Sequence, residues 1–179
     1  MSLITNDGQF IKKISGHVID PGSLFVKTDR DGHVIVCDEG DREIKVLSSD
    51  GAKLLQSFSA PGCNAVPSCV FYHRDKFFVS YWEIHHVKVF DGEGKFLFNI
   101  GSEGSGKGQL MYPRSLVVDA FDNLIVCDSG NKRLQMFTQD GTFLSSFGQE
   151  IQTPWSMTIC FNGDLLVTDY GKHCIYTLR

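Results

Sequence analysis

The sequence predicts an all-β propeller made of four-stranded antiparallel units. The clearest unit is residues 113–148, where four short apolar runs alternate with turns rich in Gly, Asn and Asp. Short strands bounded by such turns are typical of β-hairpins. The pattern recurs along the chain about every 41 to 46 residues, and a repeat of this period indicates a propeller or a solenoid. A proline opens each copy, at Pro21, Pro67, Pro113 and Pro154.

The second and third strands of each copy repeat most clearly. With the turn between them they cover residues 34–47, 77–90, 124–137 and 165–178. A fourth strand follows in the first three copies, but the last copy ends at Arg179 without one. The chain begins with residues 6–14, NDGQFIKKI, which have the pattern of a fourth strand. We therefore expect this strand to complete the last blade and to close four blades into a ring without an exposed edge.

These units predict one domain over residues 1–179, because no linker, low-complexity tract or helical periodicity interrupts them. The expected boundaries are a lone strand at 1–14 and blades at 15–58, 59–100, 101–147 and 148–179. Helix content should be close to nil.

Composition favours the cytoplasm and argues against several classes of ligand. No apolar run approaches the ~20 residues that span a membrane, and the N-terminus lacks the pattern of a signal peptide. Six scattered cysteines form no Cys-x-x-Cys pair and no zinc spacing, so we expect free thiols, no metal and no cofactor. The formal net charge of −4 argues against a DNA-binding domain.

Residues 126–137 read VCDSGNKRLQMF; they follow a glycine-rich segment and Tyr-Pro-Arg, and precede DGTFLSSFG. These motifs resemble NHL repeats, and the resemblance covers nearly the whole chain, most weakly in the second unit. It is closest to the C-terminal NHL domains of tripartite-motif (TRIM) proteins, which are RING-type E3 ubiquitin ligases. The resemblance implies a recognition propeller, with the ligase chemistry in a separate RING domain. Because NHL propellers commonly have six blades, the alternative is that this chain is the C-terminal part of a six-bladed ring.

In a four-stranded blade, the loops between blades and the turns joining the second and third strands lie on one face. We call this the loop face; it includes residues 39–43, 82–86, 101–114, 128–133 and 170–173. The opposite face carries short turns that look structural. We expect ligands on the loop face, and the resemblance implies partner or substrate proteins in some family members and single-stranded RNA in others.

Basic side chains of the expected loop face gather in the third and fourth units, whereas the first two units are acidic. The basic set is Lys107, Arg114, Lys132, Arg133, Lys172 and His173. With Tyr112, Trp155 and Tyr170 nearby, the set suits single-stranded RNA, which needs cations for phosphates and flat rings for bases. The set also suits a docked protein, which we favour, and the third alternative is an ordinary solvated surface without a ligand.

Arg114 and Trp155 follow their prolines directly, where the innermost strand begins near the mouth of the ring. They are therefore the best individual candidates for contact with a ligand. Trp82, next to Ile84, His85 and His86, is either part of a contact patch or a cover for its own blade.

Asp38, Asp128 and Asp169 recur at one position of the repeat, with Arg42, Arg133 or His173 shortly after. A carboxylate that caps the turn and is held across the hairpin explains this repetition better than an active site, which would be unique. A metal-dependent propeller hydrolase or lyase is a remote alternative, since the expected inner strands offer no converging ligands. We therefore expect a non-catalytic recognition domain.

Overall fold

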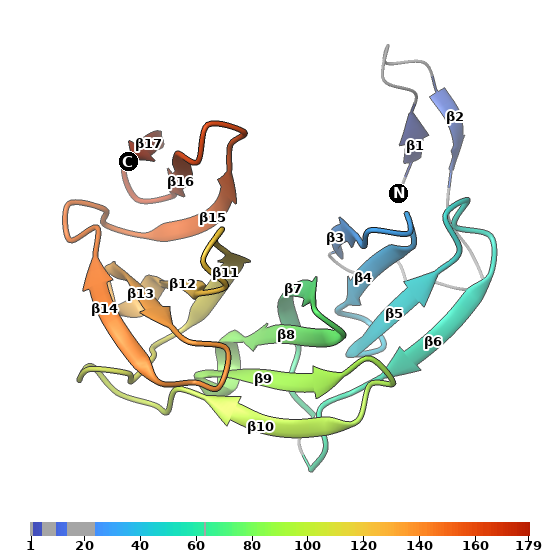
Figure 1. The fold of residues 1–179 in the computed structure, drawn as a ribbon, viewed down its shortest axis with the longest axis horizontal. Helices are drawn as coiled ribbons and strands as arrows, with labels where there is room; N and C mark the ends of the chain where they lie inside the picture. Colours follow the sequence, from blue (N-terminus) through green and yellow to red (C-terminus); the bar gives the residue numbers. More distant parts are fainter. Residues whose placement is uncertain (1, 5–9, 14–23, 63) are drawn as a thin grey trace.

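The computed structural model describes residues 2–4, 10–13, 24–62 and 64–179, and its strands form the blades of a propeller (Figure 1). Blades one and two contain β3 (Leu24–Thr28), β4 (Val34–Asp38), β5 (Glu43–Leu47), β6 (Leu54–Phe58), β7 (Pro67–His73), β8 (Lys76–Tyr81), β9 (His86–Asp91) and β10 (Phe96–Ile100). Blades three and four contain β11 (Pro113–Val118), β12 (Leu124–Asp128), β13 (Arg133–Phe137), β14 (Phe143–Phe147), β15 (Pro154–Ile159), β16 (Leu165–Asp169) and β17 (Cys174–Leu178).

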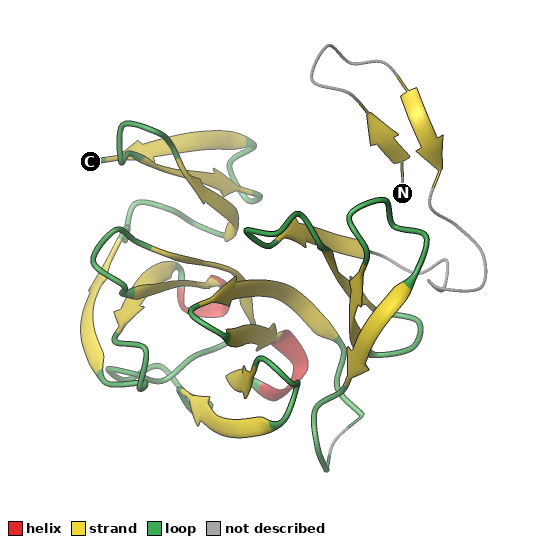
Figure 2. Ribbon diagram, turned by 45° about the vertical axis from the view of Figure 1, so that its right-hand side comes forward, coloured by secondary structure: helices red, strands yellow, loops and turns green. Residues whose placement is uncertain are grey.

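Each blade is an antiparallel meander, as the alternation of apolar runs and turns predicts. The first strands of neighbouring blades contact each other, β3 with β7, β7 with β11 and β11 with β15, so they form the centre of the propeller. The only helical segments in the described part are the two short turns Trp82–Ile84 and Ser129–Asn131 (Figure 2). The expected all-β propeller of four encoded blades is confirmed.

The N-terminal strand does not complete the last blade. Residues 6–9 and 14 of the expected strand lie outside the described part, and the described remainder, β2 (Phe10–Lys13), pairs with β1 (Ser2–Ile4). Within the described residues, β17 pairs only with β16, and β1 and β2 lie beside the first blade (Figure 1). A hairpin with its sequence neighbour closes a much shorter loop than a pairing with β17, so it has the smaller entropic cost.

The outward sheet face of the fourth blade is consequently uncovered. Ile175 is 66% exposed, whereas Ile44, Val87 and Leu134 hold the same register position in the other blades and are fully buried. Where a blade is packed on both faces, its strands are apolar at successive positions, as in β4 and β12. In β16, burial alternates along the strand, which indicates that only one face is packed.

Neighbouring blades are also joined by hydroxyl groups at the ends of their second strands. Ser80 Oγ donates to the carbonyl of Arg114, and Ser129 Oγ donates to the carbonyl of Pro154. Both acceptors belong to the opening residues of the next blade's first strand. These bonds therefore fix the position at which each inner strand begins.

A buried aspartate holds the loop face of the third blade together. Asp128 Oδ1 accepts a hydrogen bond of 2.7 Å from the backbone N–H of Met111 in the loop between blades. Its Oδ2 accepts bonds from Arg133 Nε at 2.8 Å and from Gln135 Nε2 at 2.9 Å, both on β13. One carboxylate thus ties together the turn, the third strand and the preceding loop, as a structural role for the repeated aspartate predicts.

The equivalent carboxylates of Asp38 and Asp169 have different hydrogen-bond partners. Asp38 accepts bonds from the N–H groups of Gly40 and Asp41, and its cation is Lys45 at 2.8 Å. The expected partner Arg42 instead donates to the carbonyl of Asn64, 2.8 Å away.

Asp169 accepts four backbone N–H groups, those of Gln152, Thr153, Gly171 and Lys172. Burial on its own raises the pKa of Asp169, but the four N–H groups together hold that pKa below its usual value.

Replacing Asp128 by alanine should strongly destabilise the domain. The change leaves the half-enclosed Arg133 guanidinium without its counter-charge and the Met111 N–H without its acceptor, so we expect a loss of about 3 kcal/mol in the free energy of unfolding. Urea denaturation measures it. Asp140→Ala, in the exposed turn between β13 and β14, is the control and should lose less. Equal losses would contradict the central role of Asp128.

The lowered pKa of Asp169 predicts an acid-sensitive contribution to stability. A carboxyl group whose pKa is lower in the folded state stabilises fully above its unfolded pKa of about 3.9, and this contribution is lost as the pH falls through the folded pKa. Urea unfolding measured between neutral pH and pH values below 4 should show the loss. In Asp169→Asn the acid-dependent part should shrink, and an unchanged pH profile would contradict the assignment.

Candidate functional site

Side chains from blades two, three and four form a continuous line of contacts on the loop face. In order of contact, this aromatic line consists of His85, Tyr112, Trp82, Arg114, Trp155, Tyr170 and His173. The six contacts join rings, or a ring and the guanidinium, at centre-to-centre distances between 4.1 and 6.2 Å. The sequence analysis names five of the seven as candidate contact residues and places the other two, His85 and Tyr170, beside them on the loop face.

Arg114 lies at the middle of the aromatic line. Its guanidinium carbon is 4.9 Å from the ring centroid of Trp82 and 4.1 Å from that of Trp155, and the two tryptophans come from the blades on either side. Burial lowers the pKa of Arg114, and the charge of Glu39 offsets part of this effect. An arginine nevertheless stays protonated at neutral pH.

Local structure explains why these side chains meet. Arg114 and Trp155 each follow the proline that opens a first strand, so both occur at the same level of the ring. Trp82 begins the short helical turn between β8 and β9, and its ring contacts run to Tyr112 and Arg114 of the next blade. Of the two roles considered for Trp82, these contacts favour a place in a patch shared between blades.

The residue that ends each turn between second and third strands has a left-handed backbone. It is Arg42, His85, Lys132 or His173, with φ between 54° and 60°. This conformation favours glycine or asparagine, and other residues adopt it at an energetic cost. All four side chains are nevertheless cationic or imidazole groups that lie on the loop face. His85 also accepts a 3.0 Å hydrogen bond at Nδ1 from the backbone N–H of Tyr112, a contact that the sequence did not reveal.

Some cations of the expected basic set form hydrogen bonds within the protein, and others do not. Arg133 donates to Asp128 and also to the carbonyls of Gly106 and Gln109. Lys172 Nζ donates to the carbonyl of Glu150 at 2.9 Å and to the Tyr176 hydroxyl at 3.1 Å.

Lys107 and Lys132 are exposed, and their side chains make no hydrogen bond or ion pair within the described part of the chain. The sequence shows the number of cations on this face, but it does not show which of them the fold already uses.

A pocket of about 220 Å³ lies at the centre of the propeller, lined by first-strand residues of all four blades and by Glu39. A second hollow of about 280 Å³ follows the aromatic line past Trp82 and Tyr112. Arg114 and Trp155 line both, so they stand where the central pocket opens onto the loop face. Ser68, which also lines the pocket, has a buried Oγ without a hydrogen-bond partner among the described residues.

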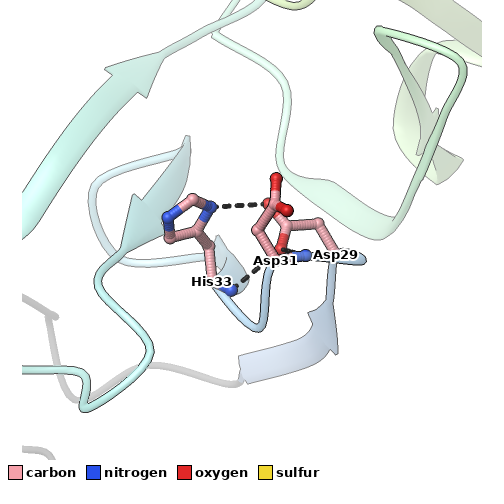
Figure 3. A group of neighbouring side chains, drawn as sticks. All are labelled: Asp29, Asp31 and His33. Carbon is pink, nitrogen blue, oxygen red and sulfur yellow. Dashed lines mark hydrogen bonds and ion pairs between the residues drawn. The ribbon is translucent and has the colours of Figure 1, made fainter.

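Asp29, Asp31 and His33 form a cluster of potential metal ligands on the opposite face (Figure 3). Asp29 accepts bonds from the N–H groups of Asp31 and His33 and contacts His33 Nδ1 at 2.8 Å. In the third blade, Asp119 caps the equivalent turn in the same way, with the Asn123 amide in place of the imidazole. The cluster therefore has the geometry of a repeated turn cap, and we assign it no ligand.

The sequence model of a family described as a 6-bladed beta-propeller matches residues 63–170, more than half of the chain. The chain belongs to this family. It is 32% identical over 88 residues to Protein brain tumor of Drosophila melanogaster, a match that covers 48% of this chain and 8% of that protein. It is 29% identical over 93 residues to the E3 ubiquitin-protein ligase NHLRC1 of Rattus norvegicus, covering 52% and 24%. The expected NHL-repeat propeller, resembling those of TRIM-NHL proteins, is confirmed.

Among solved structures, a streptogramin B lyase superposes with a TM-score of 0.75 at 15% identity, covering 93% of this chain and 54% of the lyase chain. Identity this low shows the fold alone. The chain thus spans a minor part of its curated relatives and about half of the lyase. Neither helical turn in the described residues is long and apolar enough to cross a membrane.

The left-handed residue of the third blade's turn predicts an unusual mutational response. Glycine adopts this left-handed conformation without the energetic cost that lysine incurs. In Lys132→Gly we therefore expect the free energy of unfolding to stay the same or to rise by up to about 1 kcal/mol. The adjacent Arg133→Gly is the control and should destabilise, because it removes the bond to Asp128. Urea denaturation compares the two, and destabilisation by Lys132→Gly would show that the lysine serves the fold.

Proposed function

We propose that this propeller is a non-catalytic recognition domain of a protein similar to the TRIM-NHL E3 ubiquitin ligases, and that it binds a protein substrate or partner on its loop face. The observation that carries this proposal is the Arg114 guanidinium, flanked by Trp82 and Trp155 at the centre of that face. Tryptophan, tyrosine and arginine are the side chains that contribute most binding energy at protein interfaces.

The scaffold beneath the aromatic line supports the same proposal. Asp128 and Asp169 fix the loops on either side of the line through hydrogen bonds to buried carboxylates, so the contact residues are held before a partner arrives. A surface ordered in advance loses less conformational entropy on binding. We favour recognition over a metal-dependent hydrolase or lyase because of the residues that line the central pocket. Among the described residues, this lining contains one carboxylate, Glu39, and three serines, but no histidine that could bind a metal.

Single-stranded RNA is the second candidate ligand. The exposed Lys107 and Lys132, on the blade that carries Arg114 and Tyr112, favour it, because flat rings and cations together bind bases and phosphates. We place it second because Arg133 and Lys172 already donate to groups of the protein itself. The five described cysteines are all unpaired, and we propose the reducing cytoplasm as the compartment.

Site-directed photo-crosslinking in cells tests which face binds a partner. A photoreactive amino acid at Lys132, on the loop face, should form covalent adducts with a partner protein that mass spectrometry identifies. The same group at Asp140, on the opposite face, is the control and should form none. Trp155→Ala should remove the Lys132 adducts without unfolding the domain, since this ring is partly exposed.

The RNA candidate is tested on the same variants by fluorescence anisotropy with short single-stranded RNAs at ~50 and ~200 mM salt. Binding that weakens steeply with salt and disappears in Lys132→Glu, without protein adducts, would replace protein recognition by RNA recognition. Adducts formed equally from both faces would contradict a dedicated loop-face site.

A further inference from the structure

We infer that Arg114 and the central pocket bind one carboxylate group of the partner, supplied by a single aspartate or glutamate side chain in an extended segment. This inference rests on the proposed function, since it identifies the chemistry by which the loop face would recognise a protein.

The first observation is that Arg114 has unused donors. A guanidinium carries five N–H groups, and within the described residues the side chain of Arg114 makes no hydrogen bond and has no carboxylate at ion-pair distance. Glu39 influences its pKa only through longer-range charge interaction. Partly buried N–H donors without an acceptor are unfavourable, and an acceptor supplied by a ligand removes that penalty.

The second observation is the direction from which a ligand can approach. Trp82 and Trp155, from the two flanking blades, have ring centroids 4.9 and 4.1 Å from the guanidinium carbon, and the central pocket that Arg114 lines is the side from which a ligand can reach its N–H groups. Edge-on approach in the guanidinium plane is the geometry of a bidentate carboxylate pair. The two indoles cover part of the guanidinium, and less polar surroundings strengthen such a pair.

The third observation is the pocket that opens beside Arg114. Its volume of about 220 Å³ accommodates a short side chain. The buried Oγ of Ser68 in its wall has no partner among the described residues, and buried hydroxyl groups are normally paired. We therefore assign Ser68 as a donor to the bound carboxylate, from the blade that also supplies Trp82.

The charges around the pocket favour a single carboxylate over a polyanion. Glu39 lines the pocket from the first blade and repels additional negative charge. The exposed cations Lys107 and Lys132 do not line this pocket. A nucleic acid backbone requires a series of cations along its path, whereas one planar guanidinium beside a small pocket suits one carboxylate.

Peptide selection with the intact 179-residue chain tests the inference. A displayed library of random peptides should yield binders that share an aspartate or glutamate next to apolar residues. In a selected peptide, replacing that residue by its amide should weaken binding by about tenfold or more, because the charge-assisted bidentate pair is lost. Calorimetry or anisotropy measures both peptides on each variant.

Protein variants locate the effect. On Arg114→Gln the acidic peptide and its amide should bind equally weakly, and Arg114→Lys should restore little of the difference because lysine lacks the planar fork. Lys95→Gln, in the exposed turn between β9 and β10 on the opposite face, is the matched control and should leave the difference intact. The peptide substitutions on the unchanged protein also decide the matter if a variant fails to fold.

The outcomes separate the two proposals. A library without any binder overturns protein recognition and the carboxylate inference together. Binders that lack a shared acidic residue, or whose preference for it survives in a folded Arg114→Gln, overturn only the carboxylate site. Acidic preference that disappears with Arg114 supports it.

Discussion

The loop face depends on one buried carboxylate in each of three blades. The turn between the second and third strands is far in the chain from the loop that enters the blade. Their relative position is therefore fixed only if one group forms hydrogen bonds with both. Asp128 supplies it in the third blade by accepting from Met111 of the loop and Arg133 of the strand, and Asp169 does so in the fourth through backbone N–H groups alone. Because these acceptors are buried, their bonds are shielded from water and hold the surface in one arrangement.

The second blade lacks this aspartate, and the contact surface depends on that exception. Tyr81 occupies the position, and Glu83 in the following turn accepts the Val66 N–H of the preceding loop at 3.3 Å. The turn is therefore still anchored, but its first residue is the bulky Trp82, which extends over the third blade to Arg114. The unit with the weakest resemblance to the repeat therefore supplies the side chain that joins blades two and three in one line of contacts.

The sequence predicts those parts of the structure that a local pattern determines. Strands such as Leu124–Asp128 and the position of Arg114 after Pro113 follow from alternation, turn residues and the repeat itself. The pairing of β2 with β1 was missed because the pattern of residues 6–14 indicates a strand but does not show which strand it pairs with. The engagement of Lys172 by Glu150 was missed because it depends on a contact between segments far apart in the chain.

The last blade shows how the binding surface relates to the rest of the ring. Its outward face exposes Ile175, and it carries Thr168 where the third blade has the buried Cys127. The corresponding face is buried in the other blades and is less apolar in this one. The family is described as six-bladed and this chain encodes four blades. All seven members of the aromatic line nevertheless come from blades two to four, and the aspartates that hold its loops come from blades three and four. The proposed recognition surface is therefore built by these three consecutive blades, and the first blade adds Phe25 and Glu39 to the wall of its central pocket.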